Sequence, residues 1–306
     1  MSTSSPGPLG EALQAWRARI RPEDVGLPTY GERRRVTGLR REELALLAGV
    51  SASYYTRLEQ GQSRNASPEV LDAIAGALRL TDAERLHLTA LAAGTRHRTA
   101  VKRPPAEHVD PALADLLAVL GDVPALVMGR RSDVLAWNPM GHALLAGDVD
   151  LAAPAARETR PNMADLIFTD PHNRELYGDH WPVKARAVVG NLRLVAGRHP
   201  EDPLLAQLIG NLSMSSPDFA RLWGDHRVQP CATADYELQH PLVGALTVTQ
   251  QSLRALQSPD QILVTCTAPV GSASAQALTL LAQLVHGTTR HHPTEQGRPV
   301  PGVVSR

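Results

Sequence analysis

Residues 40–61 read RREELALLAGVSASYYTRLEQG, and this stretch decides the fold of the first part of the chain. Leu44, Leu47 and Ala48 recur at helical spacing and predict one buried stripe on a first helix. Gly49 can adopt the left-handed conformation that ends a helix without steric cost. The pattern predicts a helix, a tight turn and a second helix, as in a helix-turn-helix. An ordinary helical hairpin is the alternative.

The second helix of this motif should begin after Ser51, whose hydroxyl suits an N-cap. Tyr55 and Leu58 then fall on the face that packs against the first helix. The side chains left on the outward face are Ser51, Ala52, Ser53, Thr56 and Arg57. In a helix-turn-helix this face enters the major groove of DNA, where an arginine can donate two hydrogen bonds to guanine. The motif therefore predicts sequence-specific binding of double-stranded DNA.

Three more helices are predicted around the motif, over residues 9–20, 68–78 and 82–93. Ser67 should cap the second of them, because a proline follows it at the first helical position. Together with the two motif helices they form a mainly α, five-helix N-terminal domain, which we place at residues 1–100.

Charge is spread unevenly along the chain, although 31 Lys+Arg balance 31 Asp+Glu overall. Residues 1–103 carry 16 basic against 11 acidic side chains, which suits a polyanionic partner. The long loop 21–38 ends in three arginines that we expect to contact phosphates or the minor groove. These are Arg33, Arg34 and Arg35. A solvated run of charges is the alternative interpretation.

A second domain is predicted at residues 106–290, after a basic, proline-containing hinge at 94–105. Two short strands, several helices, three more strands and a final helix are expected in that order. This is the order of a PAS-type sensor, an antiparallel sheet with helices on one face, so the prediction is an α+β PAS-like domain. The polar tail, residues 291–306, is expected to be mobile.

Short motifs in both halves of the chain carry a family resemblance. They are GLRREELA at 38–45, LAGVS at 47–51, YYTRLEQG at 54–61, Trp137-Asn138, Asp170-Pro171, His180-Trp181, SPDFARLW at 216–223 and HPLVG at 240–244. On these motifs the chain resembles the MmyB-type transcriptional regulators over roughly residues 9–285. The resemblance implies an XRE-type helix-turn-helix followed by a PAS-like ligand-binding domain, whose pocket is similar to fatty-acid-binding pockets.

The resemblance also assigns roles within the motif. In related helix-turn-helix proteins the position of Arg41 contacts phosphate, and the outward positions of the second helix face the bases. This chain departs from them at Ala52 and Ser53, where longer polar residues are common, so more specificity should fall on Arg57 and on DNA shape. The expected DNA contacts are Arg33, Arg34, Arg35, Arg40, Arg41, Ser51, Ala52, Ser53, Thr56 and Arg57.

The second domain is expected to bind a small hydrophobic, fatty-acid-like ligand. Nearly all its Trp and Phe residues lie beside polar residues at the ends of predicted elements, as an apolar pocket with a polar mouth requires. Two arginines on one long predicted helix could hold a carboxylate. The candidate contacts are Trp137, Asn138, His180, Trp181, Arg186, Arg193, Phe219 and Trp223. The alternatives are that the aromatic residues are core and that the domain only dimerises.

The expected assembly is a homodimer, joined through the second domain, on an inverted-repeat operator. One short helix reads too few base pairs to find a single site in a genome. Two such helices would read half-sites one helical turn apart.

Other functional classes are less favoured by the sequence. It contains no glycine-flanked nucleophile, phosphate loop or dinucleotide fingerprint, so an enzyme fused to a DNA-binding domain is the weaker alternative. The histidines are scattered, and Cys231 and Cys266 are expected to be buried thiols, so we expect no metal and no cofactor. Without a signal-peptide pattern or an apolar run of roughly 18 residues, a cytoplasmic location and no membrane partner are expected.

Overall fold

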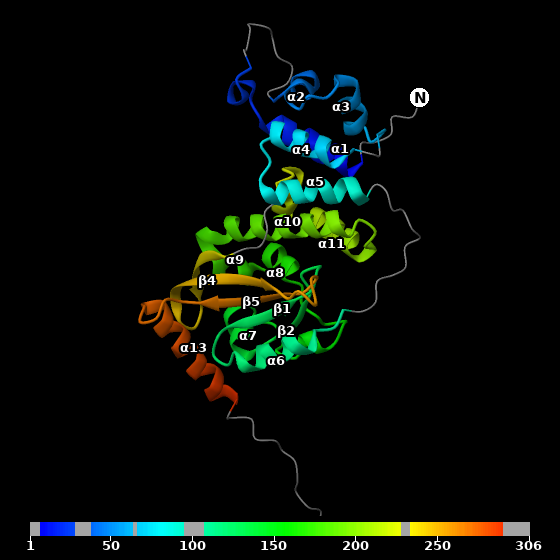
Figure 1. Ribbon diagram of the computed structural model, residues 1–306. Helices are drawn as coiled ribbons and strands as arrows, with labels where there is room; N and C mark the ends of the chain where they lie inside the picture. Colours follow the sequence, from blue (N-terminus) through cyan, green and yellow to red (C-terminus); the bar gives the residue numbers. More distant parts are fainter. Residues whose placement is uncertain (1–6, 28–37, 64–65, 95–106, 228–232, 290–306) are drawn as a thin grey trace, which may run out of the picture.

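The computed structural model describes residues 7–27, 38–63, 66–94, 107–227 and 233–289 (Figure 1). These residues form an N-terminal helical domain and a C-terminal domain that contains both helices and a sheet. The predicted hinge, apart from Gly94, and the predicted tail lie outside the described residues. None of the helices in these ranges combines the length and hydropathy that crossing a bilayer would need.

The N-terminal domain contains the five predicted helices. They are α1 (Pro8–Arg19), α2 (Arg41–Leu47), α3 (Ala52–Glu59), α4 (Pro68–Ala77) and α5 (Asp82–Gly94), with a 3-10 turn, η1 (Pro22–Val25), between α1 and α2. Their core contains the fully buried side chains of Trp16, Leu44, Tyr55 and Ile74. Helices α2 and α3 lie at the end of the molecule that is farthest from the sheet (Figure 1).

The turn between α2 and α3 is the one that the sequence predicts. Gly49 has φ +65°, in the left-handed region, and the Ser51 hydroxyl accepts a hydrogen bond from the Tyr54 backbone N–H at 3.1 Å. The predicted apolar stripe on α2 was wrong at one position. Leu44 and Ala48 are buried, but Leu47 is 37 % exposed. The buried face of this short helix is completed by the small Ala45, which leaves position 47 at its margin.

The C-terminal domain begins with α6 (Pro111–Val119) and ends with α13 (Ala273–Thr289). Its strands are β1 (Ala125–Met128), β2 (Val134–Trp137), β3 (Ala234–His240), β4 (Gly244–Arg254) and β5 (Ile262–Thr267). Its other helices are α7 (Pro139–Leu145), α8 (Met163–Thr169), α9 (Pro171–Tyr177), α10 (Trp181–Arg198), α11 (Pro203–Ser215) and α12 (Pro217–Gly224), with 3-10 turns η2 (Ala153–Ala155) and η3 (Gly178–His180).

The strands form one antiparallel sheet in the order β2-β1-β5-β4-β3. This confirms the α+β PAS-like architecture. Register is fixed by apolar cross-strand pairs such as Leu238 with Leu246, whose side chains enter the large core beneath α7, α8 and α10.

The prediction that helices cover only one face of the sheet was wrong. Val127, Leu135 and Leu263 point to the other face, where α6 buries them with Leu113 and Leu117. Successive side chains of a strand point to opposite faces of the sheet. Leu126 of β1 therefore points into the main core, and its neighbour Val127 points to the α6 side. Because neighbouring strands carry apolar residues on both faces, a helix is needed on each.

The two domains are in contact along their helices. Helix α5 of the first domain lies against α10 of the second (Figure 1). Leu194, on α10, is part of the buried cluster that forms the core of the helical domain.

Candidate DNA interface and ligand site

The outward face of α3 is exposed at three of its five predicted positions. Ser51, Ser53 and Arg57 are exposed, and Ala52 and Thr56 are half-buried. Within the described part of the chain, the Arg57 guanidinium has no hydrogen bond or ion pair, so its donors are available to an external acceptor. An exposed arginine beside short side chains lets a helix approach base edges closely.

A buried carboxylate holds α3 in place. Glu59 is fully buried, and it accepts hydrogen bonds from Arg17 Nε at 3.0 Å, Arg17 Nη2 at 3.1 Å and Arg41 Nε at 2.8 Å. The bidentate contact with Arg17 joins α1 to the end of α3, and such forks are strong and specific in orientation. This pair was not predicted from the sequence, although Glu59 lies one helical turn after Tyr55, on the face predicted to be buried.

Glu59 also changes the environment of its neighbours. Burial raises the pKa of the Tyr55 phenol above its ordinary value, and the charge of Glu59 adds to the effect. Arg41, the predicted phosphate contact, has a side chain that is 42 % exposed while one edge of its guanidinium binds Glu59. The remaining donors of Arg41 can still reach a phosphate.

The other predicted DNA contacts precede α2. The backbone N–H of Arg40 donates to Glu43 Oε2 at 2.6 Å and caps the helix. The predicted basic triplet lies outside the described residues. It consists of Arg33, Arg34 and Arg35.

Four aromatic rings form a continuous stack inside the C-terminal domain. The rings of Trp181 and Phe168 meet edge-on with their centroids 5.7 Å apart, and those of Phe168 and Phe219 meet edge-on with their centroids 5.1 Å apart. Phe219 stacks on Trp223 with its centroid at 5.7 Å and an interplanar angle of 11°. The indole N–H of Trp181 donates to the carbonyl of Ile167 at 2.8 Å. Phe168, Trp181 and Phe219 belong to the main core, and the half-buried Trp223 packs against it.

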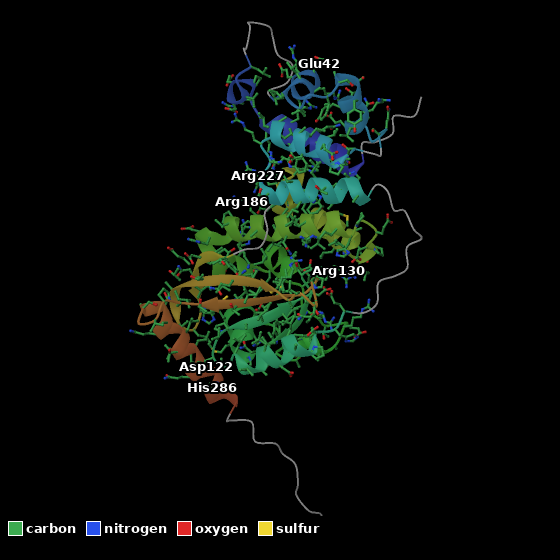
Figure 2. All side chains as sticks on the ribbon, in the orientation of Figure 1. Glu42, Asp122, Arg130, Arg186, Arg227 and His286 are labelled. Atoms are coloured by element: carbon green, nitrogen blue, oxygen red, sulfur yellow. The ribbon has the colours of Figure 1, made fainter. Side chains whose placement is uncertain are left out.

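Arg193 ends this stack. Its Cζ lies 4.3 Å from the centroid of the Trp223 ring, Nη2 donates to the Trp223 carbonyl, and Nη1 lies 2.8 Å from His226 Nδ1. Burial lowers the pKa of Arg193 to about 10, so its charge persists at neutral pH. Arg186, two turns earlier on α10, is exposed (Figure 2), and the two arginines do not share a site.

An apolar groove of about 440 Å³ lies at the other end of the domain, between α6, the β2–α7 corner and the end of α13. Its lining includes Leu117, Ala118, Trp137, Asn138, Met140 and His286. At the rim, His286 Nε2 lies 3.3 Å from Asp122 Oδ1, and Figure 2 shows the two side chains next to each other. The groove falls within the roughly 300–1,000 Å³ typical of small-molecule sites.

Two predicted ligand contacts form part of this groove. Trp137 is largely buried, and its indole N–H donates to the Leu151 carbonyl at 2.8 Å. The Asn138 Oδ1 accepts from the backbone N–H groups of Ala125 and Gly141, and its Nδ2 donates to two carbonyls of the preceding loop. The amide of Asn138 is therefore occupied by the protein and shapes the wall of the groove.

The family model described as the MmyB-like transcription regulator ligand binding domain matches residues 109–281, more than half of the chain. The chain belongs to the MmyB-like transcription regulators. A model described as a helix-turn-helix domain matches residues 8–88. No curated protein matches the chain. This MmyB-like regulator is therefore a DNA-binding transcription regulator with a ligand-binding domain.

The candidate ligand residues of this MmyB-like regulator fall in separate places. Trp137 and Asn138 line the groove, whereas Trp181, Phe219, Trp223 and Arg193 form the internal stack. His180 lies beside β3, with Nε2 3.9 Å from Glu237 Oε2. The groove residues on α6 and α13 were missed, because no sequence signal links two helices so far apart in the chain.

In the ranges that the structure describes, no group of three His, Cys, Asp or Glu side chains could hold a metal ion. Burial raises the pKa of the Cys266 thiol to about 11, which confirms that Cys266 is a buried thiol. Cys231 lies outside the described residues.

Proposed function

We propose that this MmyB-like regulator binds an inverted-repeat operator as a homodimer, and that a small hydrophobic, fatty-acid-like ligand in the C-terminal domain changes its operator affinity. The observation that supports the ligand most strongly is the apolar groove beside Trp137. The regulator class follows from its two domains. The ligand, its effect and the dimer are the proposed part.

The proposed DNA contact uses the exposed face of α3. Arg57 has free donors for a base edge, and the N-terminus of α3 directs unpaired backbone N–H groups outward, which favours a phosphate nearby. The helix has only eight residues, so one copy reads few base pairs. A dimer with its two α3 helices about 34 Å apart would read two half-sites.

The groove chemistry fits an amphipathic acid. Leu117, Ala118 and Met140 offer an apolar wall for a hydrocarbon chain, and His286 Nε2 at the rim already lies 3.3 Å from one carboxylate oxygen, Oδ1 of Asp122. A ligand carboxylate can replace Asp122 as the partner of His286. His286 is accordingly the proposed head-group residue, in place of Arg186 and Arg193.

The test compares two tryptophan substitutions on α6 in the full chain. Ala118→Trp fills the groove, whereas Ala112→Trp, on an exposed position of the same helix that does not line the groove, is the matched control. Binding of dodecanoate by calorimetry should weaken by about ten-fold or more in the first variant only, because bulk replaces the apolar volume. Equal binding by both variants would place the ligand elsewhere.

Operator affinity is measured in the same samples, on a duplex selected from a random pool by the wild-type chain. Dodecanoate should change that affinity for the wild type and the control, and leave the filled variant unchanged. Binding without any change in operator affinity would show that the C-terminal domain only dimerises. Small molecules extracted from the purified protein should include a lipid.

A further inference from the structure

The contact between the two domains is unusually close at one point. His87 of α5 lies directly against Gly197 of α10. A Cβ atom added at Gly197 would lie 2.5 Å from His87 Nδ1 and 2.7 Å from Cε1. The His87 side chain is buried, so its ring has little room to move. Glycine is therefore what lets α5 approach α10 here.

A second contact joins α1 to the end of α12. The indole N–H of Trp16, a fully buried residue, donates to the carbonyl of His226 at 3.1 Å. The ring of Trp16 also meets the ring of His87 edge-on, with the two centroids 6.2 Å apart. His226 has φ +50°, and its ring is held by Arg193. The aromatic stack of the ligand-binding domain is thus linked through Arg193 and His226 to Trp16 of the DNA-binding domain.

The link continues to the helix that faces DNA. Arg17 follows Trp16 on α1, and it forms the bidentate contact with Glu59 at the end of α3. Helix α1 therefore contacts the ligand-binding domain through one residue and α3 through the next. At the other end, Trp137 and Met140 of the groove belong to the same buried cluster as Phe219, so packed side chains connect the groove to the junction.

Two buried nitrogen atoms at the contact between the two domains lack hydrogen-bond partners among the described residues. They are His87 Nδ1 and Arg193 Nε. Unpaired buried polar atoms are destabilising, and both would be hydrated if the domains moved apart. This offers a second arrangement that is accessible in energy, which any coupling between sites needs.

We propose that the interdomain joint, formed by Trp16, His87, Arg193, Gly197 and His226, transmits ligand occupancy in the C-terminal domain to α3, with Arg193 as its positioning residue. The inference rests on the proposed function, since it names the route by which that ligand acts. A ligand that repacks the core would move the aromatic stack and, with it, Arg193. This would shift the equilibrium between the arrangement in which the two domains are in contact and the one in which they have moved apart, and so change the placement of α1 and α3.

The substitution Gly197→Ala, which adds one methyl group, tests the interdomain joint. Gly197→Ala forces the ring of His87 away from α10 and touches neither the groove nor the outward face of α3. Gly210→Ala is the matched control, because Gly210 is also a helical glycine and an added Cβ meets nothing within 4 Å. The double variant Gly197→Ala/His87→Ala removes the clash and should recover the behaviour of His87→Ala alone.

Hydrogen exchange in the full chain without ligand is the first measurement. Gly197→Ala should speed exchange of the α1 and α5 backbone amides by about ten-fold, as expected when a local opening becomes easier, and Gly210→Ala should not. Equal exchange in both variants would overturn the inference, whether or not the protein responds to a ligand.

The second measurement is the effect of dodecanoate on operator affinity, by fluorescence anisotropy. We expect the wild type and Gly210→Ala to show a change within roughly 5- to 150-fold, and Gly197→Ala to bind both dodecanoate and operator with almost no effect of one on the other. An undiminished effect in Gly197→Ala would overturn the joint and leave the proposed function standing. A wild type that binds both but shows no effect would overturn both. Arg193→Met should behave like Gly197→Ala.

Discussion

The substitution Arg17→Met should destabilise the helical domain far more than the removal of an exposed ion pair. Arg17 has a largely buried side chain and provides two of the three hydrogen bonds that the fully buried Glu59 receives from arginines. Methionine matches the length of the arginine stem but carries no donor. Glu59 would keep only Arg41, whose side chain is 42 % exposed.

The expected magnitude follows from burial. Removing one partner of a buried ion pair destabilises a protein by about 3–5 kcal/mol, because the other charge remains without compensation. Since Arg41 stays in place, we expect about 2–4 kcal/mol here. This is a large part of the roughly 5–15 kcal/mol that stabilises a domain. The control is Arg85→Met, which removes the Arg85–Asp72 pair at 2.5 Å; that pair is exposed and should contribute about 0–1 kcal/mol.

The assay is native-state hydrogen exchange of the full chain, followed at the backbone amides of α3, since it reports the stability of one region in a larger protein. The second variant to measure is Arg17→Met/Glu59→Leu, in which an apolar side chain replaces the stranded carboxylate and most of the loss should be regained. If Arg17→Met has no larger effect than Arg85→Met, the Glu59 contact does not hold α3 in place.

Three further outcomes are expected. Arg57→Ala should weaken binding to the selected operator by roughly 1–3 kcal/mol and relax the preference at one base pair; equal weakening on random duplexes would make Arg57 a backbone contact. Operator affinity should fall steeply with salt, by about one log unit per log unit of salt for each phosphate contact, and a flat dependence would contradict a phosphate-rich interface. Stability should fall on acidification. Burial, followed by the charge of Arg193, lowers the pKa of His87 and of His226 to about 4, and the other charged groups that influence these rings are Arg19 and Asp225. The folded protein keeps both rings neutral, whereas the unfolded chain takes up protons below about pH 6.5. Their contribution is thus complete above pH 6.5 and is lost as pH falls toward 4. Urea midpoints between pH 7.5 and 4.5 measure this loss, and His87→Gln should reduce the slope.

The fold could be predicted well where local chemistry decides it. Gly49, Ser51 and Ser67 end or begin helices through their own conformational preferences and hydroxyls, and the structure confirms each of them. The order of strands and helices in the second domain was also sufficient to predict a PAS-like sheet. These features need no knowledge of distant contacts.

The candidate sites could be predicted only in part, because burial depends on tertiary contacts. The sequence pattern treats Trp137 and Trp223 alike, yet α6 and α13 make a groove beside Trp137, while Trp223 stacks on Phe219 at the edge of the core. Leu47 looked as apolar as Leu44 but lies at the edge of the buried face. Glu59 could not be assigned a role without knowing that Arg17 faces it.

The position of Leu194 bears on whether the two domains can be separated from each other. Along the chain the two domains look separable, but Leu194 and Gly197 of the second domain complete the packing of the first. The boundary in space therefore does not coincide with the boundary in sequence. A chimaera that grafts this helix-turn-helix onto another sensor would have to bring the outer face of α10 with it, or redesign Trp16 and His87 for contact with water.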